Sequence, residues 1–136
     1  NTTTISLTEP EAGKYLWYGW SGAEKDIRWT DGREAALVFS LNELRDMSLV
    51  IEMGPFRSAR GPFEQRVMVS LNHQALESLI LTDGTIRTYS IKLPGHVLTS
   101  RTVLTFTFPD AASPASVGAG MDDRLLGIKV KSMLFQ

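Results

Sequence analysis

The stretch RTVLTFTF, residues 101–108, decides the fold class of this chain. Its apolar side chains Leu104, Phe106 and Phe108 lie two residues apart, and β-branched residues stand between them. A period of two is that of a β-strand with one buried face. Residues 35–41 and 67–71 repeat the alternation, whereas stripes with helical spacing are absent. The chain is therefore predicted to be all-β.

Working outward from these segments, we predict nine strands separated by turn-forming residues: Thr2–Thr8, Lys14–Tyr18, Glu34–Leu41, Met47–Gly54, Glu64–Leu71, Ala75–Leu81, Thr85–Leu93, Arg101–Phe108 and Leu125–Phe135. The segment Ser40–Arg45 has capping-box spacing but is too short to be more than a turn between strands. Many short strands at regular spacing are typical of an antiparallel β-sandwich or jelly roll.

Composition excludes several classes of function. A length of 136 residues fits one domain, 1–136, with a single core. Lys and Arg number 14 against 15 Asp and Glu, so no nucleic-acid partner is expected. The chain has no cysteine, which excludes disulfides and thiolate chemistry.

Because Asn1 follows no initiator Met and opens no leader, we expect a piece excised from a longer protein.

Three connections are long: 19–33, 55–63 and 109–124. Long loops on a rigid scaffold are the usual carriers of binding residues. If each strand runs antiparallel to the one before it, these loops and the Asp83-Gly84 turn all emerge at one end of the sandwich. We therefore expect a common rim at that end. His73 and His96 fall in connections at the opposite end, where we expect surface turns rather than a metal site.

The first long loop carries a set of side chains suited to a sugar. Trp20 and Trp29 offer indole faces for the apolar C–H face of a pyranose, and Glu24 and Arg28 offer partners for its hydroxyls. The alternative is structural. In that case the two indoles plug the end of the sandwich and Glu24 pairs with an arginine.

The last long loop ends in Asp122, Asp123 and Arg124. Adjacent carboxylates are oxygen ligands of the kind that calcium prefers, so a structural calcium is one hypothesis for Asp122 and Asp123. The alternative is that one aspartate accepts backbone N–H groups to hold the loop while Arg124 pairs with an acid. No other cofactor is expected.

The sequence contains none of the common catalytic motifs, neither a nucleophile elbow nor a Walker loop nor a zinc-protease helix. Glu24 with Asp122 or Asp123 is the remaining acid pair for glycoside hydrolysis. Arg57, Arg60 and Arg66 flank two Gly-Pro corners, where they either bind an anionic group or are solvated.

Several motifs occur together in an order that resembles a galactose-binding-like β-sandwich. They are Gly19-Trp20-Ser21 with Glu24 and residues 28–32, Gln65-Arg66-Val67 leading to Asn72, and Ser113-Pro114 leading to residues 122–127. The resemblance is to carbohydrate-binding-module-like accessory domains of bacterial glycosyltransferases and polysaccharide-building envelope proteins. It implies a periplasmic or extracytoplasmic location in bacteria and a glycan-related role. His73 departs from the pattern, which usually has Gly there.

The leading hypothesis is a non-catalytic carbohydrate-binding or substrate-positioning module linked to cell-envelope polysaccharide metabolism, with a glycan as partner. Trp20 and Trp29 would stack on the sugar, and the polar contacts would come from Glu24, Arg28, Asp122 and Arg124. A second hypothesis is a structural accessory domain that docks to a membrane-embedded parent glycosyltransferase without binding glycan. The third is a small glycoside hydrolase.

Overall fold

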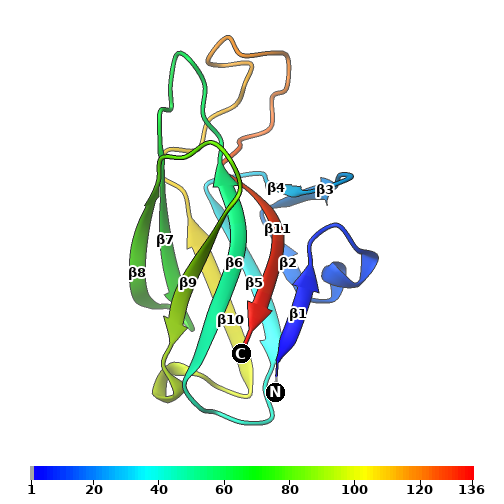
Figure 1. Ribbon diagram of the computed structural model, residues 1–136, viewed down its shortest axis with the longest axis vertical. Helices are drawn as coiled ribbons and strands as arrows, with labels where there is room; N and C mark the ends of the chain where they lie inside the picture. Colours follow the sequence, from blue (N-terminus) through cyan, green and yellow to red (C-terminus); the bar gives the residue numbers. More distant parts are fainter. Residues whose placement is uncertain (1) are drawn as a thin grey trace.

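The computed structural model describes residues 2–136, which fold into two antiparallel sheets (Figure 1). In chain order the strands and short 3-10 helices (η) are β1 Thr3–Ser6, η1 Pro10–Lys14, β2 Leu16–Tyr18, β3 Trp20–Ala23, β4 Arg28–Thr30, β5 Glu34–Ser40, β6 Met47–Pro55, β7 Gln65–Leu71, β8 Gln74–Leu81, β9 Arg87–Leu93, η2 Gly95–Val97, β10 Arg101–Thr107 and β11 Ile128–Phe135. Neither helix in this part of the chain has the length needed to cross a membrane.

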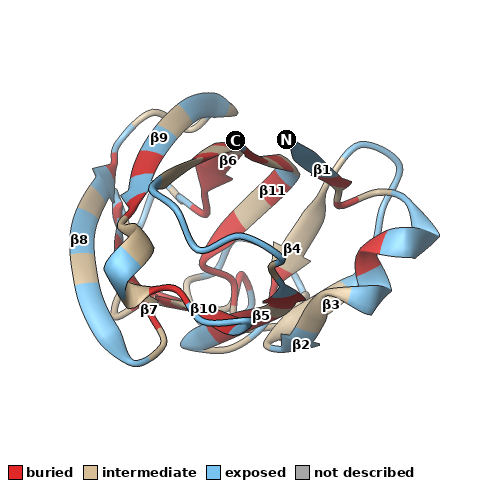
Figure 2. Ribbon diagram, turned by 90° about the horizontal axis from the view of Figure 1, so that it is seen from below, coloured by how far each residue is buried: buried red, intermediate tan, exposed pale blue. Residues whose placement is uncertain are grey.

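The six-stranded sheet has the order β3-β4-β11-β6-β9, with β1 also pairing with β11. The five-stranded sheet has the order β2-β5-β10-β7-β8. Viewed from below, the two sheets lie face to face as the layers of a sandwich (Figure 2). From β5 onward the chain passes from one sheet to the other at every connection except the β7–β8 hairpin. The predicted all-β antiparallel sandwich is therefore confirmed.

The predicted number of strands was wrong, because residues 2–136 contain eleven strands rather than nine. The two additional strands, β3 and β4, form a hairpin inside the connection 19–33 that the sequence pattern assigned to a loop. They have four and three residues, too few to show an alternation. A hairpin adds two strands, so the end at which every later loop emerges is unchanged.

Gly19 lies where the chain leaves the five-stranded sheet at β2 and enters the six-stranded sheet at β3. Its φ of +83° is in the left-handed region that favours glycine. Backbone from β5 passes very close, since a Cβ at Gly19 would lie 2.1 Å from the carbonyl oxygen of Glu34. The crossover between the sheets therefore requires glycine at this position.

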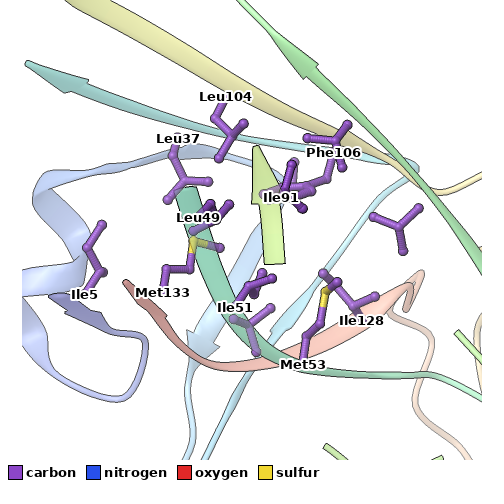
Figure 3. Close-up of a cluster of buried hydrophobic side chains, with 14 of the residues drawn as sticks. Ile5, Leu37, Leu49, Ile51, Met53, Ile91, Leu104, Phe106, Ile128 and Met133 are labelled. Atoms are coloured by element: carbon purple, nitrogen blue, oxygen red, sulfur yellow. The ribbon is translucent and has the colours of Figure 1, made fainter. Parts of the chain in front are cut away.

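The core lies between the sheets and is built from the alternating positions that the sequence pattern identifies. Leu104, Phe106 and Phe108 have no exposed surface, and the same holds for Leu37 on the neighbouring strand β5. Figure 3 shows such side chains from both sheets converging in one cluster. Burial of these apolar faces is the main stabilising term of the sandwich.

The β7–β8 hairpin closes on Asn72 and His73, which both have positive φ, 49° and 68°. Two positive φ values are typical of the type I′ turn that suits the twist of a hairpin. Asn72 also binds the neighbouring connection, because its amide donates to Val97 O at 2.8 Å and its oxygen accepts Val103 N–H. His73 thus adopts the conformation for which glycine is the usual residue.

The long loops do meet at one end of the sandwich, as predicted. The loops after β6 and β10 rise together at the top of Figure 1. Arg60 from the first lies over Gly118 of the second, where a Cβ would be 2.9 Å from Arg60 Nη1. Arg57 lies in the same way beside Gly84, in the turn between β8 and β9. The β3–β4 hairpin completes this rim, through the contacts described next.

Candidate functional site

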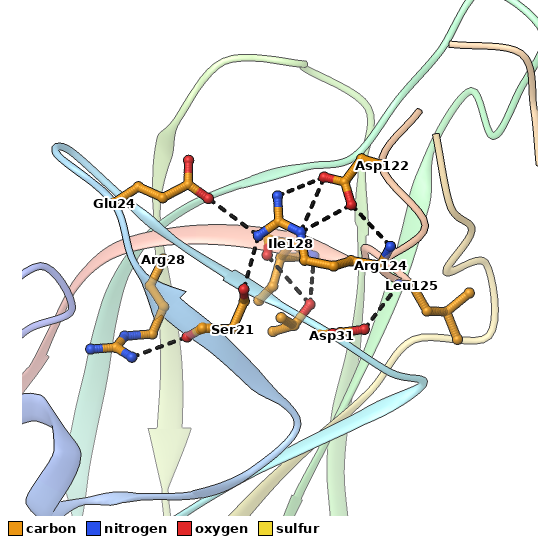
Figure 4. Close-up of polar contacts among 9 residues, drawn as sticks. Ser21, Glu24, Arg28, Asp31, Asp122, Arg124, Leu125 and Ile128 are labelled. Carbon is orange, nitrogen blue, oxygen red and sulfur yellow. Dashed lines mark hydrogen bonds and ion pairs between the residues drawn. The ribbon is translucent and has the colours of Figure 1, made fainter. Parts of the chain in front are cut away.

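The candidate site lies where the β3–β4 hairpin meets the last residues of the loop 109–127, and Arg124 is at its centre (Figure 4). The Arg124 guanidinium donates to both carboxylate oxygens of Asp122, with the shortest contact 2.6 Å from Nη2. Its Nη1 donates to Ser21 Oγ at 2.8 Å and to Glu24 Oε2 at 3.3 Å. One arginine therefore ties together two segments about a hundred residues apart.

These hydrogen bonds shift the pKa values of Arg124 and Asp122. The hydrogen bonds to Asp122, with help from Glu24, hold the pKa of Arg124 above its usual range. Reciprocally, the Arg124 side chain and then its backbone N–H lower the pKa of Asp122. Asp122 is therefore an ionised acceptor at neutral pH. Nearby, Asp31 accepts the N–H of Leu125 at 3.0 Å, so a second carboxylate holds the same loop.

Arg28 does not join this cluster, and its guanidinium points away from Arg124 (Figure 4). Its Nε donates to Leu7 O at 2.9 Å and its Nη1 to Ser21 O at 3.0 Å. Burial lowers the pKa of Arg28. The side chain thus fastens the β3–β4 hairpin to the segment after β1, which is a scaffold contact.

The two tryptophans predicted as stacking platforms also contact the scaffold. Trp20 is partly buried against the core, and its indole N–H donates to Ala36 O at 3.0 Å, which joins β3 of one sheet to β5 of the other. Trp29 is half-buried, with its ring edge-on to Phe56 at 6.3 Å and Lys129 Nζ 5.8 Å from its centroid. Neither ring lies fully open to solvent.

Of the six predicted site residues, the fold thus brings Glu24, Asp122 and Arg124 together. Two further polar residues of this region, Ser21 and Thr30, belong to the motif of the first loop but were not predicted as site residues. Thr30 is fully buried, and its hydroxyl oxygen accepts the N–H groups of Ile128 and Gly127 at 3.1 and 3.3 Å. A threonine in a short strand carries no signal of such a role.

Exposed aromatic rings occur on another surface. Trp17 is 58% exposed and Tyr18 39%, both on strand β2 at the edge of the five-stranded sheet. The strand was predicted, but alternation places consecutive residues on opposite faces and so gave no reason to expect two adjacent exposed rings.

The other basic and imidazole groups lie outside this cluster. Arg66 forms a two-pronged ion pair with Asp110, at 2.8 and 3.0 Å, which lowers the pKa of that carboxyl. His73 and His96 are exposed residues in the connections at the opposite end.

The geometry does not present a ready-made calcium site at Asp122 and Asp123. Both oxygens of Asp122 accept hydrogen bonds from Arg124, and Asp123 is exposed. Across residues 2–136, no three or more His, Cys, Asp or Glu side chains are grouped closely enough to hold a metal ion. Calcium would have to displace a guanidinium from Asp122 before it could use that carboxylate.

The sequence matches no protein-family model and no curated protein. The fold is nevertheless similar to solved carbohydrate-binding modules. The CBM36-1 domain of a multidomain xylanase from the hindgut metagenome of Trinervitermes trinervoides gives a TM-score of 0.58 at 8% identity over 100% of this chain and 97% of that one. For CBM35 from Cellvibrio japonicus Abf62 the values are 0.58 and 9%, over 100% and 93%. For a carbohydrate-binding module CBM36 in complex with calcium and xylotriose they are 0.54 and 11%, over 98% and 99%.

These similarities define the class of protein by its architecture. The chain has a β-sandwich fold of the kind seen in carbohydrate-binding modules, over essentially its whole length. The predicted carbohydrate-binding-module-like sandwich is confirmed as a fold. At 8 to 11% identity the likeness concerns the fold and not the ligand.

Proposed function

We propose that this chain is a non-catalytic glycan-binding module in which four side chains on the rim, those of Ser21, Glu24, Asp122 and Arg124, contact sugar hydroxyls. The observation that supports it is the convergence of these four polar side chains at the loop end of a sandwich with this fold. Carboxylates and guanidinium groups are suited to the paired hydrogen bonds of sugar hydroxyls.

The rim is pre-organised for binding. The Arg124 side chain is only 29% exposed and is held by three partners, whereas the Glu24 side chain is 47% exposed and its carboxylate has acceptor capacity left for a ligand. A group held rigid before binding loses little conformational entropy when the ligand arrives. Hydrogen bonds of this kind, without a deep pocket, predict affinities of roughly 10 μM to 1 mM for a free oligosaccharide.

The same contacts favour binding over hydrolysis. A glycosidase needs one carboxyl group that keeps its proton near neutral pH, and such a group has a raised pKa. Here Glu24 and Asp122 both bind the Arg124 guanidinium, and the pKa of Asp122 is lowered. The Arg124 guanidinium thus keeps Asp122 ionised and unsuited to be the proton donor, so we place the hydrolase hypothesis behind the binding hypothesis.

We further propose a biological setting from the sequence resemblance. In this proposal the module belongs to a longer bacterial envelope protein, lies on the periplasmic or extracytoplasmic side, and positions a polysaccharide for a membrane-embedded glycosyltransferase. The competing proposal is that the module docks against such a partner and binds no glycan. The two differ in what the isolated module does with a sugar.

The test is a glycan array followed by NMR titration of the best glycan. We expect the backbone signals of Ser21, Glu24 and Arg124 to shift, and Glu24→Gln to weaken binding about fivefold or more. Glu77→Gln, which changes an exposed glutamate on β8, is the matched control and should bind as the unmodified protein does. Silence across bacterial glycans would refute the proposal and favour docking.

A further inference from the structure

The strand β2 carries a bulge that directs side chains away from the core. Leu16 pairs with Leu37 of β5, but Tyr18 pairs with the next residue, Ala36, so that Trp17 is the extra residue in the register. Bulges re-aim side chains and are enriched at sheet edges and near functional sites. Leu16 packs against the core, whereas Trp17 and Tyr18 are both exposed, at 58% and 39%.

The two rings form a corner on the outer face of the five-stranded sheet. Their centroids are 5.3 Å apart and their planes meet at 69°, an edge-to-face contact. Arg101, on β10, places its guanidinium carbon 5.9 Å from the centroid of the Trp17 ring, although β5 lies between β2 and β10 in the sheet. Trp17 therefore reaches across the outer face of β5 and still has more than half of its surface exposed.

The two aromatic rings are flanked by polar groups of opposite charge. The Tyr18 hydroxyl donates to the Glu34 carboxylate, and this hydrogen bond is the main cause that raises the pKa of Tyr18 to about 12. Arg101 supplies one positive charge and Glu34 one negative charge. A surface with one cation, one anion and two aromatic rings favours a neutral ligand that has both an apolar face and hydroxyl groups.

We propose that Trp17, Tyr18, Glu34 and Arg101, the outer-face patch, form a second glycan-binding surface for neutral polysaccharides of β-1,4-linked pyranoses with equatorial hydroxyl groups. Such sugars expose flat C–H faces that stack on an indole, while their hydroxyls point sideways toward charged groups. The patch is on an open sheet face rather than in a loop, which suits the side of a long chain. This inference rests on the proposed function, and it concerns a different sheet from the rim.

Two aromatic rings alone bind a sugar weakly, so long oligosaccharides are the ligands with which to test the outer-face patch. Several successive residues of one polymer can occupy the patch, and the rim can hold another part of the chain, which raises the apparent affinity through effective concentration. We therefore expect a hexasaccharide to bind more tightly than a disaccharide.

The test is isothermal titration calorimetry with xylohexaose and cellohexaose on the whole chain. Trp17→Ala should weaken binding about tenfold, because one stacked ring is lost, and Tyr18→Ala should weaken it less. Ile80→Ala removes another large exposed apolar side chain, 59% exposed on β8 at the other edge of the five-stranded sheet, and serves as the matched control with affinity within about twofold of the unmodified protein. Two-dimensional NMR spectra of each variant verify the fold.

The outcomes separate this inference from the function on which it rests. If the unmodified chain binds a hexasaccharide and Trp17→Ala binds it equally well, while Glu24→Gln does not, the outer-face patch is refuted and the rim stands. If no glycan binds at all, the proposed function itself fails. If Trp17→Ala keeps its affinity but self-associates in sedimentation, the rings protect the edge strand β2 from pairing, and the inference is overturned.

Discussion

Gly19→Ala is the substitution with the largest expected effect on the fold, because it changes the crossover that carries the β3–β4 hairpin to the rim. The new methyl carbon would lie 2.1 Å from Glu34 O and 2.7 Å from Ala35 Cα. Carbon and oxygen atoms that are not bonded approach no closer than about 3.3 Å. The backbone of β2 or β5 therefore has to move by roughly 1 Å in a close-packed region.

The magnitude follows from two contributions. A non-glycine residue in the left-handed region costs about 1–2 kcal/mol. Displacing β5 weakens hydrogen bonds on either side, including the one from Trp20 Nε1 to Ala36 O, at about 1 kcal/mol each. We expect a loss of about 3–4 kcal/mol in the free energy of unfolding, against a total of about 5–15 kcal/mol for a domain.

Urea denaturation followed by tryptophan fluorescence measures this loss. The midpoint should fall by roughly 1–3 M with an unchanged slope. Gly13→Ala is the matched control, because a Cβ at Gly13 would meet nothing within 4 Å and its φ is not positive. That variant should stay within about 1 kcal/mol of the unmodified protein. A Gly19→Ala variant as stable as Gly13→Ala would refute the assignment of Gly19 to an obligatory crossover.

Three further predictions concern the rim and the distal hairpin. The lowered pKa of Asp122 means that its contribution to stability is present above its ordinary pKa of 3.8 and is lost as the pH falls from that value toward the lower pKa of the folded state. The stability difference between the unmodified protein and Arg124→Met should therefore shrink between about pH 5 and pH 2 in urea titrations, and a constant difference would contradict the ion pair. His73→Gly should raise the free energy of unfolding by about 0.5–1 kcal/mol, because glycine adopts the positive φ of 68° without strain. A loss of stability would show that the His73 imidazole makes a stabilising contact. Calcium at millimolar concentration should leave the midpoint of thermal unfolding unchanged, because the Arg124 guanidinium already binds both carboxylate oxygens of Asp122. A midpoint that rises with calcium and falls with a chelator would show that the ion displaces the guanidinium.

Most of the sandwich could be predicted because its strands alternate. In residues 65–71 every second side chain is buried, and the sequence places the apolar residues Val67, Val69 and Leu71 at that spacing. Gln65, which is polar and buried, and Met68, which is apolar and exposed, are the exceptions. The β3–β4 hairpin could not be predicted in this way. Its strands lie at the sheet edge and are held by Arg28 and by pairing with β11, which are contacts distant in sequence.

The candidate site also has one part that the sequence predicted and one part that it could not predict. Parity of the strands predicted that the loops holding Glu24 and Arg124 share one end of the sandwich, and they do, at 3.3 Å. Residue type alone could not separate Arg28 from Arg124. The two have the same chemistry, but one binds backbone carbonyls of the scaffold and the other binds two carboxylates.

The amino-acid sequence by itself determined the fold class, because burial of one strand face imposes a period of two that is visible in any single strand. Counting antiparallel strands also predicted the end of the sandwich at which the long loops emerge, and this prediction held because the two strands that were missed form a hairpin. Tertiary structure alone decided where side chains depart from that alternation. The bulge at Trp17 and the sheet switch at Gly19 arise from pairing with β5, and such pairing between distant segments leaves no periodic trace in the residues that it redirects.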